Sequence, residues 1–446
     1  MTDRDDRSFL GHPKGLAYLA FTEAWERFSF SGMQAMLVLY MVGELLHPGH
    51  IEHVIGFGGL RSALESVYGP LAPQPLSSAI FGLYTGLVFF MPVLGGHAGD
   101  RWFGQHRMVM AGALFMAAGH FLMAFEASFL LALLLLIVGA GCLKGNISKQ
   151  VGGLYRDDDR RRSDAFQIFS MAMNSGIIIA PLICGTLGEL YGWHYGFGAA
   201  GVGMLIGLGI YISGQRYLPP DTIDRSAAAK GPMLPSDRRV LPILALVFLM
   251  TACFLLTAGQ LGNVYSLWLK DHVDRTVGGH AIPITWFQSL TPLFSVALTP
   301  LVLRLWQRQA ISAREPSLFA KMGIGLAMAG GGMILLALLS TFGGIGWWWL
   351  LPTHLLVSMA YIFVYPVGIA LFSRIAPAGA RAMYIGIFFL SSFVASNLVG
   401  FLGGFYATMS PFAFWALHGC LGLGGALVAL LAIRPFRAVL AAQDPS

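Results

Sequence analysis

Residues 22–28 read Thr22-Glu23-Ala24-Trp25-Glu26-Arg27-Phe28. They lie within residues 15–46, a stretch apolar enough and long enough to cross a bilayer, for which about 20 residues suffice. A charge near the middle of such a helix costs at least about 2.5–3.5 kcal/mol. Glu23 precedes Glu26 by three residues and Arg27 by four, so the three charges share one helix face. We therefore expect a proton, ion or substrate path at this face.

The composition predicts an all-α polytopic membrane protein. Of the 446 residues, 56% are hydrophobic and only 11% are charged. The first apolar segment is too long and too charged to be a cleavable signal peptide. Twelve membrane spans are predicted, at residues 15–44, 77–98, 108–126, 129–150, 164–187, 194–215, 241–268, 284–307, 318–341, 346–374, 381–407 and 411–433.

The distribution of positive charge predicts that both termini are cytoplasmic. In that orientation the inner loops and helix ends hold 23 of the 28 lysines and arginines, as the positive-inside rule requires. The net charge of +6 then reflects basic loops facing an anionic leaflet, so the expected partner is the lipid bilayer and not nucleic acid. The predicted location is the cell inner membrane.

A polar, proline-containing segment at residues 215–239 divides the chain into two predicted bundles. Residues 1–214 form the first six-helix bundle and residues 240–434 the second. Residues 435–446 are predicted to form a cytoplasmic tail. Halves of similar length with equal numbers of helices are typical of transporters built from related repeats.

Cysteine and histidine positions predict neither a disulfide nor a metal site. Four cysteines fall in predicted spans without CxxC spacing, and we interpret them as packing residues: Cys142, Cys184, Cys253 and Cys420. His47, His50 and His53 share an outer loop without an acidic or cysteine ligand at a fixed spacing. A solvated loop is favoured over a metal-binding or pH-sensing role for these histidines.

A glycine-rich segment follows the second predicted span. It reads Gly95-Gly96-His97-Ala98-Gly99-Asp100-Arg101-Trp102-Phe103-Gly104, with His106 and Arg107 after it. The glycines allow two helices to approach closely and to turn at the membrane face. Asp100 is expected to cap the next helix or to pair with Arg101 or Arg107. The pattern resembles the loop motif of the major facilitator superfamily, which latches the inward gate in that superfamily.

Lys144 is the second cation predicted inside the membrane. It is expected at a depth similar to that of Glu23, Glu26 and Arg27, so that two acids and two bases form a neutral cluster. A purely structural role for Lys144 is the alternative. No predicted helix of the second half carries an acidic residue, so any membrane-embedded carboxylate that binds a proton must lie in the first half.

Several motifs together resemble one transporter family, the proton-dependent oligopeptide transporters (POT or PTR family). Glu23-x-x-Glu26-Arg27-Phe28-x-x-x-Gly32-Met33 resembles that family's first-helix motif. Lys144-Gly145-Asn146 is similar to its Lys-Pro-Asn motif. Further similar segments follow in family order over nearly the whole chain, at residues 169–176, 191–203, 286–292, 314–317 and 389–391.

The chain departs from the family pattern at positions that face the cargo. Phe30, Ser31 and Gln34 stand where the family has two tyrosines and an arginine. Thr291 replaces the asparagine before the proline of the eighth helix. Tyr361 stands in place of the tenth-helix glutamate that receives a peptide's amino group. The other departures are Ser170 for a tyrosine, Gly259 beside Gln260 for the seventh-helix glutamate, and Phe388 for a tryptophan.

The resemblance implies a major facilitator fold and proton-driven import of di- or tripeptides by alternating access. Glu23 or Glu26 is expected to release its proton when Arg27 or Lys144 is freed from substrate. The gating loop is expected to use Gly95, Gly96, Asp100, Arg101, Gly104 and Arg107. The residues expected to contact substrate are Phe30, Gln34, Lys144, Asn174, Gln260, Thr291, Tyr361 and Phe388.

The same residues allow other functions. A modified peptide, an amino-acid conjugate or another organic anion is the alternative cargo, because the usual partner for a peptide's amino group is replaced. A non-transporting membrane sensor could share the fold. An enzyme is not expected, since HExxH, GxSxG and paired-aspartate motifs are absent. We expect a monomer with no cofactor, in which the proton is the coupling ion.

Overall fold

The computed structural model describes residues 7–156, 159–221, 223, 238–312, 314–377 and 381–441. It divides into two compact units. Unit 1 contains Met1–Pro73, Leu87–Ser226 and Pro283–Ser289, and unit 2 contains Gln74–Gly86, Ala227–Ile282 and Leu290–Ser446. Most of the linker expected at residues 215–239 lies outside the described residues, as do residues 157 and 158 and the last five of the expected tail.

The described part of unit 1 is built from helices joined by turns and loops. Three of its helical elements (η1, η3 and η5) are π-helical. Its elements are α1 (Lys14–Tyr40), η1 (Met41–Leu45), η2 (Ile51–His53), α2 (Phe57–Tyr68), the second part of α3 (Pro73–Ala98), η3 (Gly99–Phe103), α4 (Gln105–Leu122), η4 (Glu126–Ser128), α5 (Phe129–Gly153), α6 (Arg161–Ala180), η5 (Pro181–Gly185), α7 (Thr186–Tyr191), α8 (Trp193–Gly214), η6 (Gln215–Tyr217) and η7 (Ile284–Ser289).

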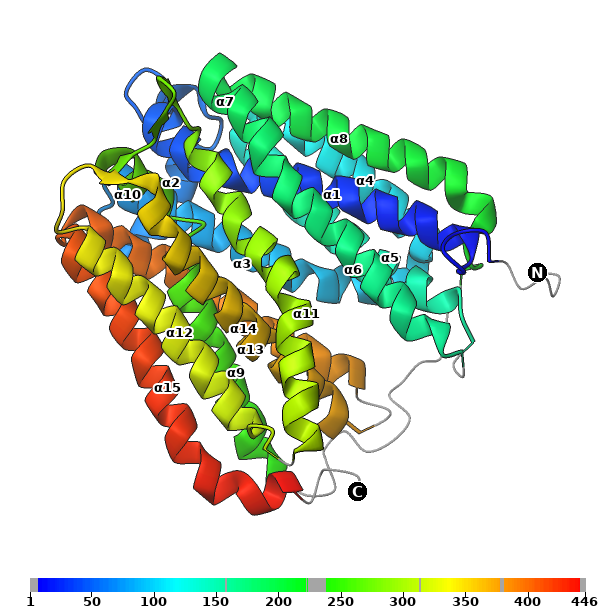
Figure 1. The fold of residues 1–446 in the computed structure, drawn as a ribbon. Helices are drawn as coiled ribbons and strands as arrows, with labels where there is room; N and C mark the ends of the chain where they lie inside the picture. Colours follow the sequence, from blue (N-terminus) through cyan, green and yellow to red (C-terminus); the bar gives the residue numbers. More distant parts are fainter. Residues whose placement is uncertain are drawn as a thin grey trace. The chain divides into compact units, whose positions relative to one another are not determined.

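Unit 2 is also built from helices, of which α12 and α15 lie side by side (Figure 1). Four two-residue strands pair in its loops, β1 parallel with β4 and β2 antiparallel with β3. Beside the first part of α3, its elements are α9 (Val240–Gly259), α10 (Tyr265–His272), β1 (Val273–Asp274), β2 (Thr276–Val277), β3 (His280–Ala281), α11 (Leu290–Ile311), α12 (Leu318–Leu339), β4 (Ile345–Gly346), η8 (Trp347–Leu350), α13 (Leu351–Ile375), α14 (Arg381–Gly403), η10 (Gly404–Ala407) and α15 (Pro411–Ala441).

Eleven helical segments of the described chain are long and apolar enough to cross a membrane. They correspond to eleven of the twelve predicted spans, although the helix predicted at residues 241–268 ends at Gly259. The remaining prediction, residues 108–126, corresponds to α4, an 18-residue helix that starts with Gln105, His106 and Arg107 and contains His120. These polar residues lower its mean hydropathy. The multi-pass, all-helical character predicted from the sequence is confirmed, and all four cysteines are free thiols.

Close packing fixes the charged part of α1 within unit 1. α1 packs against α6 and α8 (Figure 1). A Cβ at Gly176 of α6 would overlap the Ala24 carbonyl oxygen, and one at Gly207 of α8 would lie 3.1 Å from Trp25 Cβ. Ser29 Oγ also donates a 2.7 Å hydrogen bond to the Ala200 carbonyl. The backbone of the charged segment is thus held by helices on two sides.

The start of the span at Ile284–Ile311 is anchored in unit 1 by one carboxylate. Glu189 accepts hydrogen bonds from the backbone nitrogens of Ile284 and Thr285, each 2.8 Å long. The Thr285 hydroxyl donates a third, of 2.7 Å. Trp286 Nε1 donates to Thr186 Oγ1 at 2.7 Å. Glu189 thereby satisfies amide groups at the start of η7, as an N-cap residue does.

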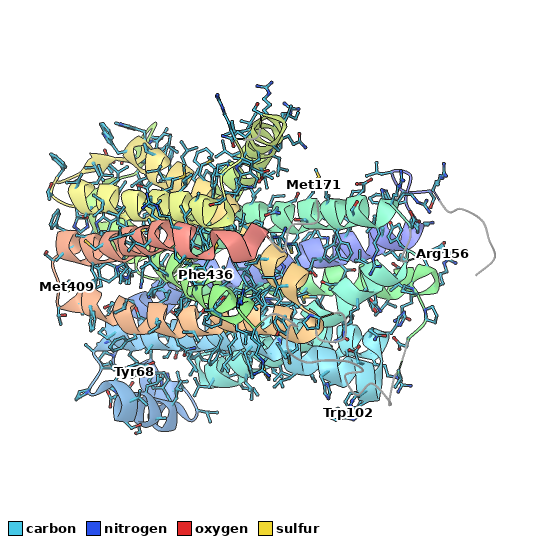
Figure 2. The ribbon with its side chains drawn as sticks, turned by 90° about the horizontal axis from the view of Figure 1, so that it is seen from below. Tyr68, Trp102, Arg156, Met171, Met409 and Phe436 are labelled. Atoms are coloured by element: carbon cyan, nitrogen blue, oxygen red, sulfur yellow. The ribbon has the colours of Figure 1, made fainter. Side chains whose placement is uncertain are left out.

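The two ends of the unit 1 helices differ in character. Tyr68 lies at the end opposite Trp102 and Arg156 (Figure 2). The Trp102 end carries the glycine-rich loop and Arg156. The Tyr68 end carries α2 and the histidine-containing loop that precedes it.

Gly112 should be intolerant of even one additional carbon. A Cβ there would lie 2.7 Å from the Gly139 carbonyl oxygen, where α4 crosses α5. We expect Gly112→Ala to lower the melting temperature of the detergent-purified protein, since overpacking costs about 1–3 kcal/mol.

The matched control is Gly209→Ala in α8, where a Cβ meets nothing within 4 Å. That variant should be unchanged or slightly stabilised, because alanine favours a helix over glycine by about 0.5–1 kcal/mol. Equal melting temperatures for the two variants would contradict the proposed close contact between α4 and α5.

Candidate functional site

Arg27 binds both glutamates of the charged segment. Its Nη2 lies 2.8 Å from Glu23 Oε1, and its Nε lies 2.8 Å from the same oxygen and 3.1 Å from Glu26 Oε2. Glu23 is 2% exposed and Glu26 is fully buried. The helical spacing read from the sequence therefore brings these three groups together on one face of α1.

The two buried carboxylates are incompletely satisfied. Within the described residues, Glu23 Oε2 and both oxygens of Glu26 accept no hydrogen bond. One guanidinium thus faces two carboxylates, and a buried carboxylate without hydrogen bonds is costly in its ionised form. Binding a proton at either acid removes one of the two negative charges. The chemistry of this group is therefore suited to the uptake and release of one proton.

Lys144 does not complete an ion-paired tetrad with these residues. Within the described part of the chain, no carboxylate lies within 4.0 Å of its ammonium. The Nζ atom instead stands 4.2 Å from the centre of the Phe30 ring and 5.9 Å from that of Phe89. Such cation–π contacts contribute about 0.5–2 kcal/mol. The cluster contains the predicted two acids and two bases, but only Arg27 forms ion pairs with the two glutamates.

The other substrate-contact residues predicted in unit 1 differ in their engagement. Phe30 is buried under the Lys144 ammonium, and Gln34, one turn further along α1, is half-buried. Asn174 of α6 donates to the Ser170 carbonyl of its own helix at 2.8 Å. Its amide oxygen therefore stays available, while its NH2 group is partly used within the helix.

Gln260 of unit 2 belongs to a buried structural network. Its Nε2 donates to the Val399 carbonyl at 3.0 Å, and its Oε1 accepts from Asn263 Nδ2 at 3.2 Å. Asn263 Oδ1 in turn accepts from Ser78 Oγ at 3.1 Å. Both ends of the Gln260 amide are thus bonded to the protein, and the side chain is fully buried. This arrangement gives Gln260 the role of a brace after α9, and its contact with substrate stays a prediction.

Thr291 is joined to a second buried network in unit 2. Its hydroxyl lies 2.8 Å from His354 Nδ1, and His354 Nε2 lies 2.9 Å from the Tyr265 hydroxyl. The Thr291 carbonyl accepts a 2.8 Å hydrogen bond from Ser358. His354 thus connects α10, α11 and α13 as a hydrogen-bonded packing residue.

Tyr361 and Phe388 belong to an aromatic group on α13 and α14. The Tyr361 and Tyr365 rings are stacked, with centroids 5.6 Å apart and planes 12° apart. Tyr365 packs edge-on against Phe388, which is fully buried. Tyr361 itself is 42% exposed. Of the predicted contact residues in unit 2, Tyr361 is thus the one whose side chain is most accessible.

The glycine-rich loop is held by α5. A Cβ at Gly95 would overlap the Gly141 carbonyl oxygen, and the Gly95 carbonyl accepts a 3.1 Å hydrogen bond from Asn146. Asp100 forms an ion pair with Lys149 and accepts from Gln105 Nε2 at 3.2 Å. The partners of the loop are therefore Asn146, which belongs to the Lys144–Asn146 motif, and Lys149.

The first turn of α4 is capped by an aspartate from the segment after α8. Gly104 begins this turn with a φ of +80°, and Asp221 accepts from the His106 backbone nitrogen at 2.9 Å and ring Nδ1 at 2.8 Å. Burial alone would raise the pKa of Asp221, but the hydrogen bonds from His106 outweigh it and lower this pKa. Asp221, and not Asp100, thus performs the capping expected at this position.

Removing the Arg27 guanidinium should destabilise the protein, because it leaves two buried carboxylates without a cation. We expect Arg27→Met to lower the melting temperature markedly, since breaking a buried ion pair costs about 3–5 kcal/mol. The comparison is a triple variant with Glu23→Gln and Glu26→Gln added to Arg27→Met, which removes the uncompensated charge. The triple variant should regain most of the lost stability, and a further loss would contradict this account of the cluster.

Comparisons with known proteins identify the family. The POT family model matches residues 106–232 and 229–413. An uncharacterized transporter, YclF of Bacillus subtilis (strain 168), is 30% identical, with 95% of this chain and 94% of the relative covered. The peptide transporter YePEPT of Yersinia enterocolitica is 29% identical, with 89% of each chain covered.

A solved structure has the same fold. A crystal structure of a mutant peptide transporter POT in complex with alafosfalin superposes with a TM-score of 0.84 at 28% identity, covering 97% of this chain and 96% of that one. The family match, the relatives and the shared fold agree with the first-helix motif around Arg27. The chain belongs to the POT family of transporters.

Proposed function

We propose that this protein is a proton-coupled symporter that imports di- or tripeptides or peptide-like compounds by alternating access. The observation that carries the proposal is the buried group in which Arg27 binds Glu23 and Glu26 while three carboxylate oxygens accept no hydrogen bond in the described chain. Family membership supports coupling to protons. The names of the relatives, which include a di-/tripeptide transporter of Lactococcus lactis at 27% identity, support a peptide cargo.

The proposed topology follows the charge distribution. With α4 added to the eleven apolar segments, the chain has twelve spans, arranged as two six-helix bundles of a major facilitator fold at residues 1–214 and 240–434. Both termini face the cytoplasm, because the basic residues gather in the loops on that side. The protein works as a monomer in the cell inner membrane, with the proton as coupling ion and no cofactor.

The proton step uses competition for Arg27. When both acids are ionised, one guanidinium serves two carboxylates, and the uptake of a proton by Glu23 or Glu26 relieves the excess negative charge. A substrate carboxylate that draws Arg27 or Lys144 away changes this balance and favours protonation of the glutamates. Substrate and proton together then stabilise one conformation over the other, as coupled transport requires.

Lys144 is the proposed anchor for the substrate carboxylate. Its ammonium rests on the face of the Phe30 ring, without an acidic partner among the described residues. A cation–π contact contributes about 0.5–2 kcal/mol. An incoming carboxylate offers charge-assisted hydrogen bonds that are stronger than the contact it replaces. Phe30 and Gln34 provide neighbouring side chains of α1, and Asn174 offers a free amide oxygen.

The residue at position 361 favours a second candidate cargo. Tyr361 stands in place of the acid that receives a peptide's amino group in the family, and a buried ammonium without an acidic partner is costly. A peptide with a blocked amino group, an amino-acid conjugate or another organic anion avoids this cost. In unit 2, these cargoes would be distinguished at Tyr361, whose side chain is accessible. Thr291 and Phe388 lie on the neighbouring helices.

Proton coupling is tested by separating driven accumulation from exchange. In proteoliposomes, a variant with both Glu23→Gln and Glu26→Gln should still exchange labelled substrate across the membrane. It should lose accumulation driven by an imposed pH gradient, because neither position can release a proton. The single variants Glu23→Gln and Glu26→Gln show how much of the gradient-driven accumulation depends on each acid.

The control is Glu65→Gln, which removes a carboxylate from the exposed helix α2 of the same unit. This variant should accumulate substrate as the wild type does. Full gradient-driven accumulation by the double variant would refute the assignment of proton coupling to this pair.

The cargo is tested at position 361. Tyr361→Glu should raise uptake of a free-amine dipeptide relative to the N-acetylated form by about tenfold, the equivalent of about 1.4 kcal/mol of selective interaction. Tyr361→Gln has the same length without the charge and should leave the ratio near its wild-type value. An unchanged ratio in Tyr361→Glu would mean that this position does not face the amino group.

A further inference from the structure

We propose that Glu44, His50, His53 and Glu126 form a binding site for a divalent transition-metal ion, with Zn2+ as the representative ion. The site lies within unit 1, at the end of the helices away from the glycine-rich loop. It is separate from Glu23, Glu26, Arg27 and Lys144, and it does not depend on the proposed transport function.

The chain brings these groups together from three segments. Glu44 lies in the π-turn η1 at the end of α1, His50 and His53 lie in the loop that follows, and Glu126 opens η4 before α5. One ligand atom each from Glu44, His50 and Glu126 lies within 4.8 Å of the other two. Because His50 and Glu126 are 76 residues apart in sequence, their meeting is a result of the fold.

Glu126 organises the site by using both of its oxygens. Its Oε1 lies 2.5 Å from His50 Nδ1, and its Oε2 lies 3.1 Å from His53 Nδ1. The Glu126 side chain is 25% exposed, while those of His50 and His53 are 44% and 67% exposed. The two imidazoles therefore converge on one carboxylate in a position that an ion can reach from solution.

The donor set suits zinc or a similar borderline ion. Imidazole nitrogens and carboxylate oxygens bind Zn2+ at about 2.0–2.2 Å, so the donors around a tetrahedral ion lie roughly 3.4 Å from one another. The observed separations of the donor atoms require side-chain shifts of about 1 Å, which half-exposed side chains can make. Two nitrogens and two oxygens favour zinc over Ca2+ or Mg2+, which prefer oxygen donors alone.

A bound ion would join the end of α1 to the start of α5. These are the helices that carry the Glu23–Arg27 segment and Lys144. The hydrogen bonds between the histidines and Glu126 already connect the two segments, and the ion would replace the shared protons. Such an ion stabilises the folded protein by an amount that grows with the logarithm of the ratio of its free concentration to its dissociation constant.

The experiment uses the full chain, purified in detergent without a polyhistidine tag. Zn2+ affinity is measured by competition with a chromogenic chelator, and Co2+ is used as a spectroscopic probe of the ligand geometry. We expect one saturable equivalent of Zn2+, a visible Co2+ spectrum typical of tetrahedral coordination, and a Zn2+-dependent rise in melting temperature. Acidification should weaken binding, because the ligands must be deprotonated.

Two variants and one matched control decide the assignment. His50→Ala and Glu126→Gln should each weaken Zn2+ binding by at least about 10–100-fold, the loss seen even for groups that only support metal ligands. His47→Ala removes a histidine of the same loop whose Nε2 lies 3.0 Å from the Val42 carbonyl, and it should bind Zn2+ as the wild type does.

Two results would overturn the proposal. One is a wild-type protein without saturable Zn2+ binding, which would leave the group as hydrogen-bonded loop residues. The other is unchanged affinity in both His50→Ala and Glu126→Gln. Since His50 lies in an exposed loop, His50→Ala is expected to fold, and its melting temperature without metal verifies this independently.

Discussion

The sharing of one guanidinium by two buried carboxylates is the interaction on which the proposed function of this protein depends. Arg27 contacts Glu23 and Glu26, and the surrounding helices hold their common backbone through contacts such as that between Gly176 and Ala24. Because the helices fix the positions of these charges, the cluster cannot relax by moving apart. A change in the charge of one of these side chains must therefore be compensated by a proton, by a charged group of the substrate or by a movement of the protein.

The glycine-rich loop stands in physical contrast to that cluster. The side chains of Asp100 and Lys149 are 43% and 46% exposed, and an exposed ion pair of this kind contributes about 0–1 kcal/mol. Such a pair can open and close at small cost, which suits a loop expected to change partners during transport. The buried cluster suits coupling because its charges are costly to leave unbalanced.

Sequence reasoning succeeded where residues are related by helical periodicity. The spacing of Glu23, Glu26 and Arg27 in one helix is sufficient to predict their contact, and the glycines around Gly95 predicted a close helix approach. It was incomplete for contacts that depend on the tertiary fold. The partner of Lys144 is an aromatic ring, and Asp221 caps a helix that begins 116 residues earlier at Gln105. No local pattern encodes either contact.

The π-turn at Met41–Leu45 has a consequence for how this family can diverge. A π-turn holds one residue more than the α-helical path, so deleting one residue there would restore a regular helix. The segment that follows would keep nearly the same direction, because the wider π-turn absorbs most of the roughly 100° that one α-helical residue adds. Glu44, which lies inside the turn, would shift relative to His50 and Glu126, while the Glu23–Arg27 face, which precedes the turn, would keep its orientation. Length variation at this position therefore changes the place of Glu44 in the histidine–glutamate group without disturbing the Glu23–Arg27 group.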